Sequence, residues 1–135
     1  MKSILIASAM AVFICGSAQA QDEKIDCKSD NLNQMQLDQC AGKDFQATDA
    51  KLNALYRAMM AKYDAANQTQ LKTAEKAWLG YRDAECSYET NVSIGGTINS
   101  MMVTECRTAK TTARIKELNA QLHCQEGDLS CNAPG

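Results

Sequence analysis

Few residues of this chain could act as a nucleophile, a base or an acid in catalysis. His123 is the only histidine, and it stands beside Cys124 where the last helical pattern ends. Nucleophilic catalysis needs a neighbouring base and a group that orients that base, and one terminal histidine does not supply both. Asp83 and Glu85 are two residues apart on a predicted helix and point in different directions, so they do not form a glycosidase-type carboxylate pair. The sequence therefore predicts no enzymatic site.

The cysteines are the strongest chemical signal. A zinc site needs Cys and His clustered at short spacing, but the chain has no Cys-x-x-Cys and one histidine. Methionines at helical spacing could bind copper through their thioethers, but such residues more often fill a core; they are Met35, Met59, Met60, Met101 and Met102. We expect no cofactor and no metal. An even number of cysteines in an exported chain instead indicates disulfides, and six follow the N-terminal segment: Cys27, Cys40, Cys86, Cys106, Cys124 and Cys131.

The spacing of these cysteines favours one pairing among several. Cys86 lies ten residues before Gly96 and Cys106 ten residues after it, so an antiparallel helical hairpin that turns at this glycine places both at the same height. Two cysteines can be bridged when their Cα atoms are within about 7 Å. The other four pair by proximity along the chain, which ties the N-terminal segment to the first helix and closes the tail. The expected disulfides are Cys27–Cys40, Cys86–Cys106 and Cys124–Cys131.

The elements that position these residues are predicted to be helices. One proline, 5% aromatic residues and abundant Ala, Lys, Gln, Glu, Leu and Met are a helical composition. The first helix is expected to begin at the N-cap Asn31, with Gln34 completing a capping box. It should end near Tyr63, with Gly42 as a potential interruption. Its apolar stripe, at spacings of seven, four, three and four, is Phe45, Leu52, Tyr56, Met59 and Tyr63.

Two further helices follow in the pattern. The second is expected to begin near Asn67 and to end at the Gly95-Gly96 pair, with a stripe of Leu71, Ala74, Trp78, Tyr81, Glu85, Tyr88 and Val92. The third should run from Thr97 to Leu122, with Ile98, Met101, Met102, Ile115, Leu118 and Leu122 as its apolar residues. No strand pattern is evident. The predicted fold is all-α, a small helical hairpin or three-helix bundle stapled by disulfides.

One cluster on the second helix has two interpretations. The cluster consists of Trp78, Tyr81, Arg82 and Glu85. Tyr81 and Arg82 are adjacent, and each is three or four residues from Trp78 and from Glu85. Trp, Tyr and Arg dominate binding hot spots, which makes the cluster a candidate interaction site. Alternatively Trp78 and Tyr81 belong to the core, with Arg82 and Glu85 as a partly buried hydrogen-bonded pair. The second interpretation is preferred because the aromatic residues lie on the helix's only apolar stripe.

The N-terminal segment predicts export. Lys2 is the only charged residue before Asp22, residues 4–14 form an apolar run, and Ala18-Gln19-Ala20 has the small-x-small pattern of a signal peptidase site. The run is too short to cross a bilayer, which needs about 20 apolar residues. Cleavage is therefore expected between Ala20 and Gln21, which leaves no membrane attachment.

The export signal also has a lipoprotein interpretation, in which Cys15 is acylated. The residue before it is Ile14, where such proteins carry a small residue, so cleavage after Ala20 is preferred. The expected organisation is a signal peptide at 1–20, a helical domain at 21–122 and a C-terminal tail at 123–135. Without its signal peptide the chain has a net charge of −3, which argues against nucleic acid as a partner.

Several segments resemble the LprI-like family of small exported bacterial proteins. The most specific is Leu71 to Cys86, with Trp78, Arg82 and Cys86 at the family's offsets; Glu85 lies in the same segment. The remaining matching positions are Cys27, Cys40, Asp49, Leu52, Asn53, Tyr56, Gly95, Gly96, Cys106, Arg114 and Leu118. The resemblance covers residues 26–122, and its matching positions look like determinants of the fold.

The resemblance implies an all-α domain with bridged cysteines and inhibition of lysozyme. We therefore expect a periplasmic or secreted protein that is not an enzyme and that binds a basic lysozyme. A loop or helix end would occlude the active-site cleft, with help from acidic residues such as Glu89 near the second turn. The alternative is an envelope helper or chaperone-like protein without lysozyme binding. No partner-binding residue and no oligomeric state follow from the sequence.

Overall fold

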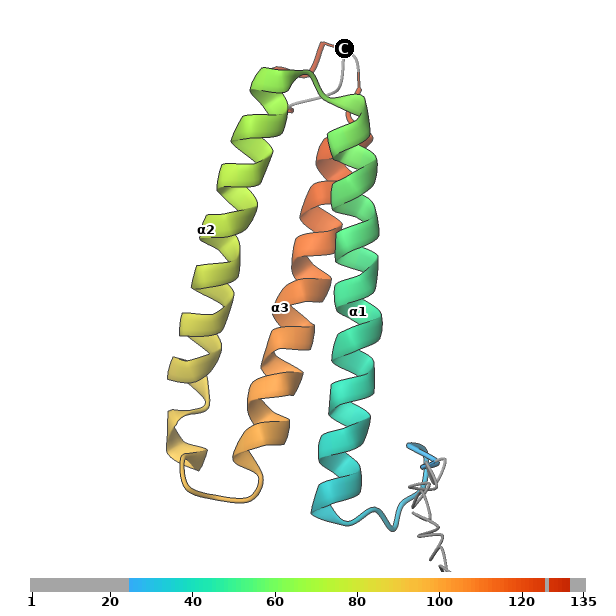
Figure 1. Cartoon of the computed structure of the whole chain (residues 1–135), viewed down its shortest axis with the longest axis vertical. Helices are drawn as coiled ribbons and strands as arrows, with labels where there is room; N and C mark the ends of the chain where they lie inside the picture. The colour runs from blue at the N-terminus through green and yellow to red at the C-terminus, as the bar shows by residue number, and fades with distance from the viewer. Residues whose placement is uncertain (1–24, 126, 132–135) are drawn as a thin grey trace, which may run out of the picture.

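Three long helices and one short 3-10 helix form a bundle. The structure is a computed structural model that describes residues 25–125 and 127–131. Its elements are α1 (Gln34–Lys62), α2 (Ala65–Glu89), η1 (Asn91–Ser93) and α3 (Asn99–Leu122). The long helices run side by side in alternating directions (Figure 1). The all-α prediction is confirmed, whereas the predicted cleavage site between Ala20 and Gln21, and Cys15, lie outside the described residues.

α1 begins two residues later than the capping box at Asn31 and Gln34 would place it. Its N-cap is Asn33, whose side chain accepts a hydrogen bond from the Gln36 N–H at 3.0 Å. In return the Asn33 N–H donates to the Gln36 side chain, also at 3.0 Å. Two backbone donors are thereby satisfied, so the predicted cap was wrong. The helix continues through Gly42 without interruption.

The ends of α2 also differ from the prediction. Its N-cap is Asp64, whose carboxylate accepts a hydrogen bond from the Asn67 N–H at 2.8 Å, so Asn67 lies within the first turn. The helix ends at the C-cap Thr90, before the glycine pair. Gly95 has φ +83°, a left-handed conformation that favours glycine. The glycine therefore shapes the connection to α3 rather than the end of α2, and α3 begins at Asn99 instead of Thr97.

The apolar core lies where α1, the first half of α2 and the last half of α3 meet. Its buried members are Leu52, Met59, Tyr63, Leu71 and Leu118, and packed against them are Leu55, Tyr56, Met60, Trp78, Ile115 and Leu122. α1 approaches α3 closely along its length, whereas α2 comes close to α1 at few points. The wider separation of α1 and α2 leaves room between them for the cleft described below. Within the described residues, no helix is long and apolar enough to cross a membrane.

The inward face of α2 includes Leu71 and Trp78 of the predicted apolar stripe but departs from that stripe towards the end of the helix. Tyr81, Tyr88 and Val92 are 53%, 78% and 96% exposed, and Glu85 is half-buried. The residues that α2 buries are Leu71, Glu75, Arg82 and Cys86. Moving the face by one residue rotates it by about 100°. The prediction was wrong because two charged side chains, with partners on the other helices, occupy the interior.

Candidate functional site

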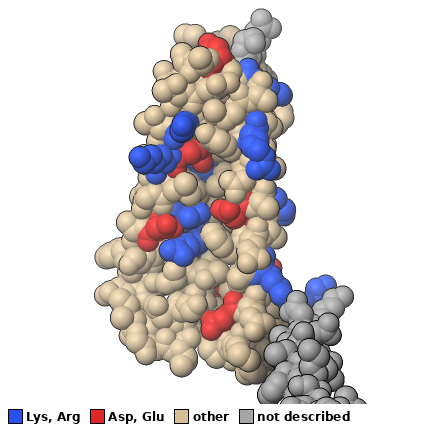
Figure 2. Space-filling model, in the orientation of Figure 1, with Lys and Arg blue, Asp and Glu red and all other residues tan. Residues whose placement is uncertain are grey.

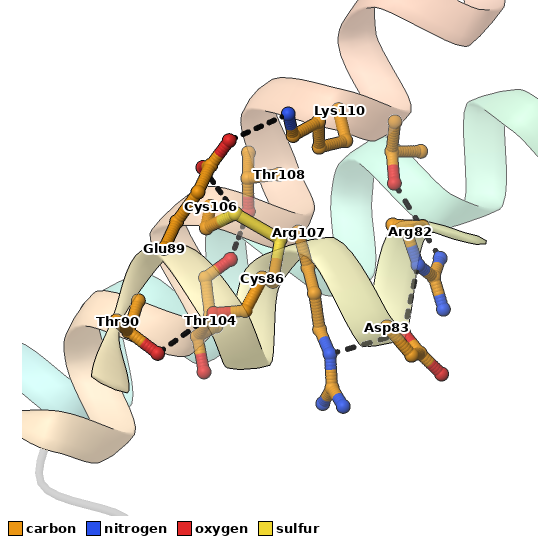
Figure 3. Close-up of a disulfide and its surroundings, with 11 residues drawn as sticks. Arg82, Asp83, Cys86, Glu89, Thr90, Thr104, Cys106, Arg107, Thr108 and Lys110 are labelled. Carbon is orange, nitrogen blue, oxygen red and sulfur yellow. Dashed lines mark hydrogen bonds and ion pairs between the residues drawn. A yellow bond between two sulfur atoms is a disulfide. The ribbon is translucent and has the colours of Figure 1, made fainter. Parts of the chain in front are cut away.

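Three disulfides staple the described part of the chain. The Cα–Cα distances are 5.7 Å for Cys27–Cys40, 5.6 Å for Cys86–Cys106 and 6.1 Å for Cys124–Cys131. The second disulfide joins the last turn of α2 to α3 (Figure 3), and Cys86 is completely buried. It therefore holds the end of α2 and the beginning of α3 at a set distance.

Arg82 lies at the centre of a polar network that joins all three helices. Its Nε donates to Asp83 Oδ1 at 3.0 Å and its Nη1 to Thr111 Oγ1 on α3 at 3.5 Å. The same Nη1 lies 3.7 Å from Asp49 Oδ1 on α1. Arg82 is only 7% exposed, and a buried cation is tolerated only when its charge and its donors are satisfied. These groups take the place of the predicted partner Glu85, so that predicted pair was wrong.

Trp78 stands between two guanidinium groups. The Cζ atoms of Arg82 and Arg114 lie 5.4 Å and 5.8 Å from the centre of its ring. Arg82 also lies 5.4 Å from the centre of the Phe45 ring on α1. Cation–π contacts contribute about 0.5–2 kcal/mol each. Trp78 and Arg82 are thus part of the packing between helices, whereas Tyr81 is 53% exposed, has its ring centre 5.9 Å from Lys110 Nζ and does not belong to the core.

Glu75 is a buried charge that the pattern of apolar residues did not reveal. It is 8% exposed, and its Oε1 accepts hydrogen bonds from Nε and Nη2 of Arg114 at 2.8 Å and 2.5 Å. Arg114 also donates to Glu117 at 2.9 Å. Burial acts to lower the pKa of Arg114, but the hydrogen bonds to Glu117 and Glu75 outweigh it and raise that pKa. The available signal was that Glu75 and Arg82 are two helical turns apart and share one face.

The α1 residues that carry the family resemblance line a cleft between α1 and α2. Its volume is about 240 Å³, and Asp49, Leu52, Asn53 and Tyr56 line one wall. The Asn53 side chain donates to Asp49 Oδ2 at 2.8 Å, and Leu52 is buried in the core. Glu75, which is paired with Arg114, lines the other wall. Asp49, Asn53 and Glu75 therefore form hydrogen bonds or ion pairs within the bundle.

The end of the bundle at the α2–α3 connection has a different surface. From Thr90 to Thr104 the chain contains no charged residue, the longest such stretch among the described residues. We call residues 90–98 the uncharged turn. Val92 is 96% and Ile94 68% exposed, and the lower left of Figure 2, where Figure 1 places this turn, is tan. Apolar periodicity does not reveal such a stretch, because the signal is a lack of charged residues rather than a repeat.

Hydrogen bonds within the uncharged turn define its shape. The Asn99 side-chain amide donates to Ser93 Oγ at 2.9 Å, and that hydroxyl donates to the Thr90 carbonyl at 2.8 Å. The Thr90 hydroxyl in turn donates to the Cys86 carbonyl at 2.7 Å. A chain of side-chain bonds thus leads from the start of α3 to the disulfide. The turn is a preformed surface with exposed aliphatic groups.

Two ion pairs between α2 and α3 lie near the uncharged turn. Glu89 accepts a hydrogen bond from Lys110 Nζ at 2.8 Å (Figure 3), and this bond raises the pKa of Lys110. The other Glu89 oxygen lies 3.3 Å from the sulfur of Cys106. Arg107 and Asp83 form a second pair, with Nε 3.2 Å from Oδ1. The predicted acidic character of this end is therefore reduced by local compensation.

The remaining side chains that could act in catalysis or bind a metal do not come together in one site. Nδ1 of His123, the C-cap of α3, lies 2.9 Å from the Asn119 carbonyl. Within residues 25–125 and 127–131, no three His, Cys, Asp or Glu side chains are grouped so that they could hold a metal ion.

Comparisons with known proteins relate the chain to one family. The family model described as lysozyme inhibitor LprI matches residues 26–118. An uncharacterized protein of Rhizobium meliloti (strain 1021) is 35% identical over 130 residues, which cover 83% of this chain and 93% of that protein. No solved structure matches the chain. The matched residues include α1, α2, the uncharged turn and most of α3.

Proposed function

Because the chain belongs to the LprI lysozyme inhibitor family, we propose that it is an exported, non-enzymatic protein that binds a lysozyme and occludes its active-site cleft. The observation that carries the proposal is the uncharged turn, which presents Val92 and Ile94 to solvent next to the Cys86–Cys106 disulfide. A preformed binding element loses little conformational freedom on association. Aliphatic side chains without neighbouring charges suit the desolvated centre of an interface.

The charge of the molecule supports the same partner. The chain without its signal peptide has a net charge of −3, although on the face shown in Figure 2 basic and acidic side chains are interspersed along the bundle. A negative protein associates faster with a basic lysozyme, because opposite net charges steer diffusional encounter. In this proposal the net negative charge of the protein attracts the enzyme and the uncharged turn makes the contact.

The proposal includes the organisation of the precursor. Cleavage between Ala20 and Gln21 would release the protein to the periplasm or the exterior, where disulfides persist. The mature chain would then consist of one helical domain, residues 21–122, followed by the tail 123–135, which the Cys124–Cys131 disulfide closes.

A second candidate function is an envelope chaperone-like binder of unfolded chains. Met35 and Met102 are 64% and 39% exposed. The start of α1 lies beside the start of α3, where the Gln34 side-chain nitrogen is 3.9 Å from the sulfur of Met101. Flexible methionine side chains adapt to many partners, so this corner of the bundle supports a less selective function.

The two functions are separated by one assay on the purified mature protein. We expect lysis of bacterial cell walls by a basic lysozyme to be inhibited at a one-to-one ratio. Association should slow as salt rises, because charges are screened over about 8 Å at physiological ionic strength. No inhibition of any lysozyme at micromolar concentration, together with suppressed aggregation of an unfolded protein, would favour the chaperone-like function instead.

A further inference from the structure

We propose that the uncharged turn is the part of this protein that enters the lysozyme cleft, and that its lack of charge matches the two carboxyl groups there. The inference rests on the proposed function, because it names the element of this chain that makes the contact and the chemistry that the element meets. The uncharged turn differs from the rest of the chain in that it lacks charged residues.

The chemistry of the cleft sets a requirement on anything that enters it. Lysozyme cleaves its polysaccharide with two carboxyl groups on either side of the scissile bond. One is held protonated by apolar surroundings, and the other stays ionised. An Asp or Glu inserted between them would be repelled by the ionised group and would lose its own hydration. An element that fills such a cleft is therefore expected to contain no acidic side chain.

The uncharged turn meets this requirement in an acidic protein. Charged residues make up 22% of the chain, yet none occurs between Glu89 and Glu105. Glu89 is directed to Lys110 on α3, and the two are hydrogen-bonded at 2.8 Å. The exposed polar groups of the turn are instead those of Asn91 and Thr97, an amide and a hydroxyl. Both donate and accept hydrogen bonds without net charge, as sugar hydroxyls do.

The geometry of the turn suits insertion. Val92 lies in η1, and Ile94 follows directly as its C-cap, so the two most exposed aliphatic side chains of the connection are two residues apart. The hydrogen bonds of Ser93 to Asn99 and Thr90 hold the backbone between them. Two helices joined by the Cys86–Cys106 disulfide support the turn from behind. Such a preformed element binds with little loss of conformational entropy.

Substitutions of opposite charge at one position test the inference. We expect Val92→Asp to weaken inhibition by about 100-fold, because juxtaposed like charges oppose binding strongly. Val92→Lys should weaken it by less than about tenfold, because the ionised carboxylate attracts the added cation. Both variants should unfold at the wild-type temperature, since the side chain is 96% exposed. A saturating sugar oligomer bound in the cleft should compete with the wild-type protein.

Leu129 offers a matched control at the opposite end of the bundle. It is an aliphatic residue with 102% relative exposure in the C-terminal segment, so Leu129→Asp and Leu129→Lys should inhibit like the wild type. Equal losses for Val92→Asp and Val92→Lys, or no competition by the sugar oligomer, would overturn insertion of the turn while inhibition itself remained. A wild-type protein that inhibits no lysozyme would overturn the proposed function and this inference with it.

Discussion

Charged side chains face the interior in the middle of the bundle, whereas apolar side chains face water at the α2–α3 end. Arg82 is 7% exposed and Glu75 is 8% exposed, but Val92 is 96% exposed. A buried charge costs free energy unless partners satisfy it. The interior charges here have such partners on other helices, so they determine how the helices lie. The exposed apolar groups have no such role within the bundle and are available for a partner protein.

The same contrast separates the residues that pair between helices from those that we propose to bind. Asp49, Arg82 and Arg114 each take part in an ion pair between helices. Trp78 fills the space between the two guanidinium groups. A polar network with satisfied members favours one arrangement of the helices over others. The paired interior residues thus set the arrangement of the helices, whereas the proposed binding surface is distinguished by its lack of charged side chains.

The largest effect is expected from Trp78→Ala. This change removes a half-buried aromatic ring and both of its cation–π contacts, and we expect the free energy of unfolding to fall by about 3–5 kcal/mol. Val92→Ala is the matched substitution at the other region, and it should change stability by less than about 0.5 kcal/mol. Urea unfolding followed by circular dichroism measures both. A Trp78→Ala protein with wild-type stability that no longer binds lysozyme would place Trp78 in the binding surface instead.

The disulfides should show an intermediate effect that connects the two regions. We expect the double variant Cys86→Ser, Cys106→Ser to lose about 3 kcal/mol, because the bond closes a loop between two core helices. The double variant Cys124→Ser, Cys131→Ser should lose less, since its short loop lies in the tail. The first variant should also inhibit lysozyme more weakly at a temperature where it remains folded, because the uncharged turn is no longer held. Equal stability and equal inhibition for the two variants would contradict this link.

The fold class and the Cys86–Cys106 disulfide could be predicted because both follow from composition and residue spacing. Composition and periodicity indicate helices, and the equal offsets of Cys86 and Cys106 from Gly96 reflect the symmetry of a helical hairpin. In the structure the Cα atoms of these cysteines are 5.6 Å apart. The start of α1 was harder, because Asn31 and Asn33 are each followed by Gln three residues later. Local sequence does not decide between two equivalent capping boxes.

The inward face of α2 could not be predicted from its own residues. Apolar periodicity placed Tyr81 in the interior, whereas the structure buries its neighbour Arg82. That choice depends on Asp49 and Thr111, which belong to other helices and are distant in sequence. The pattern of one helix contains no information about such partners. The uncharged turn is the opposite case, since the missing charges can be counted in the sequence and only the structure places them at one exposed end.

The smallest effect is expected at alkaline pH, and it can be divided between the two regions. Burial of Tyr63 in the core raises its pKa above the usual 10.0, and the hydrogen bond from Lys110 to Glu89 beside the uncharged turn raises the pKa of Lys110 above 10.5. Groups whose pKa is raised by folding contribute stability that is complete below the unfolded-state pKa and is lost as pH rises through the folded-state value. The free energy of unfolding should therefore stay constant up to about pH 9 and decrease above about pH 10.

Two variants assign this decrease to its sources. Tyr63→Phe has no hydroxyl to ionise, and Lys110→Arg keeps its positive charge at alkaline pH because the guanidinium stays protonated. In each variant the free energy of unfolding should decrease less steeply with pH than in the wild type. Urea unfolding at several pH values across this range measures it. If only Tyr63→Phe does so, the core alone senses alkaline pH, and the ion pair at Glu89 adds nothing to stability, as is common for exposed pairs. A decrease as steep as that of the wild type in both variants would contradict both assignments. Neither the protonated form of Tyr63 nor that of Lys110 would then stabilise the fold.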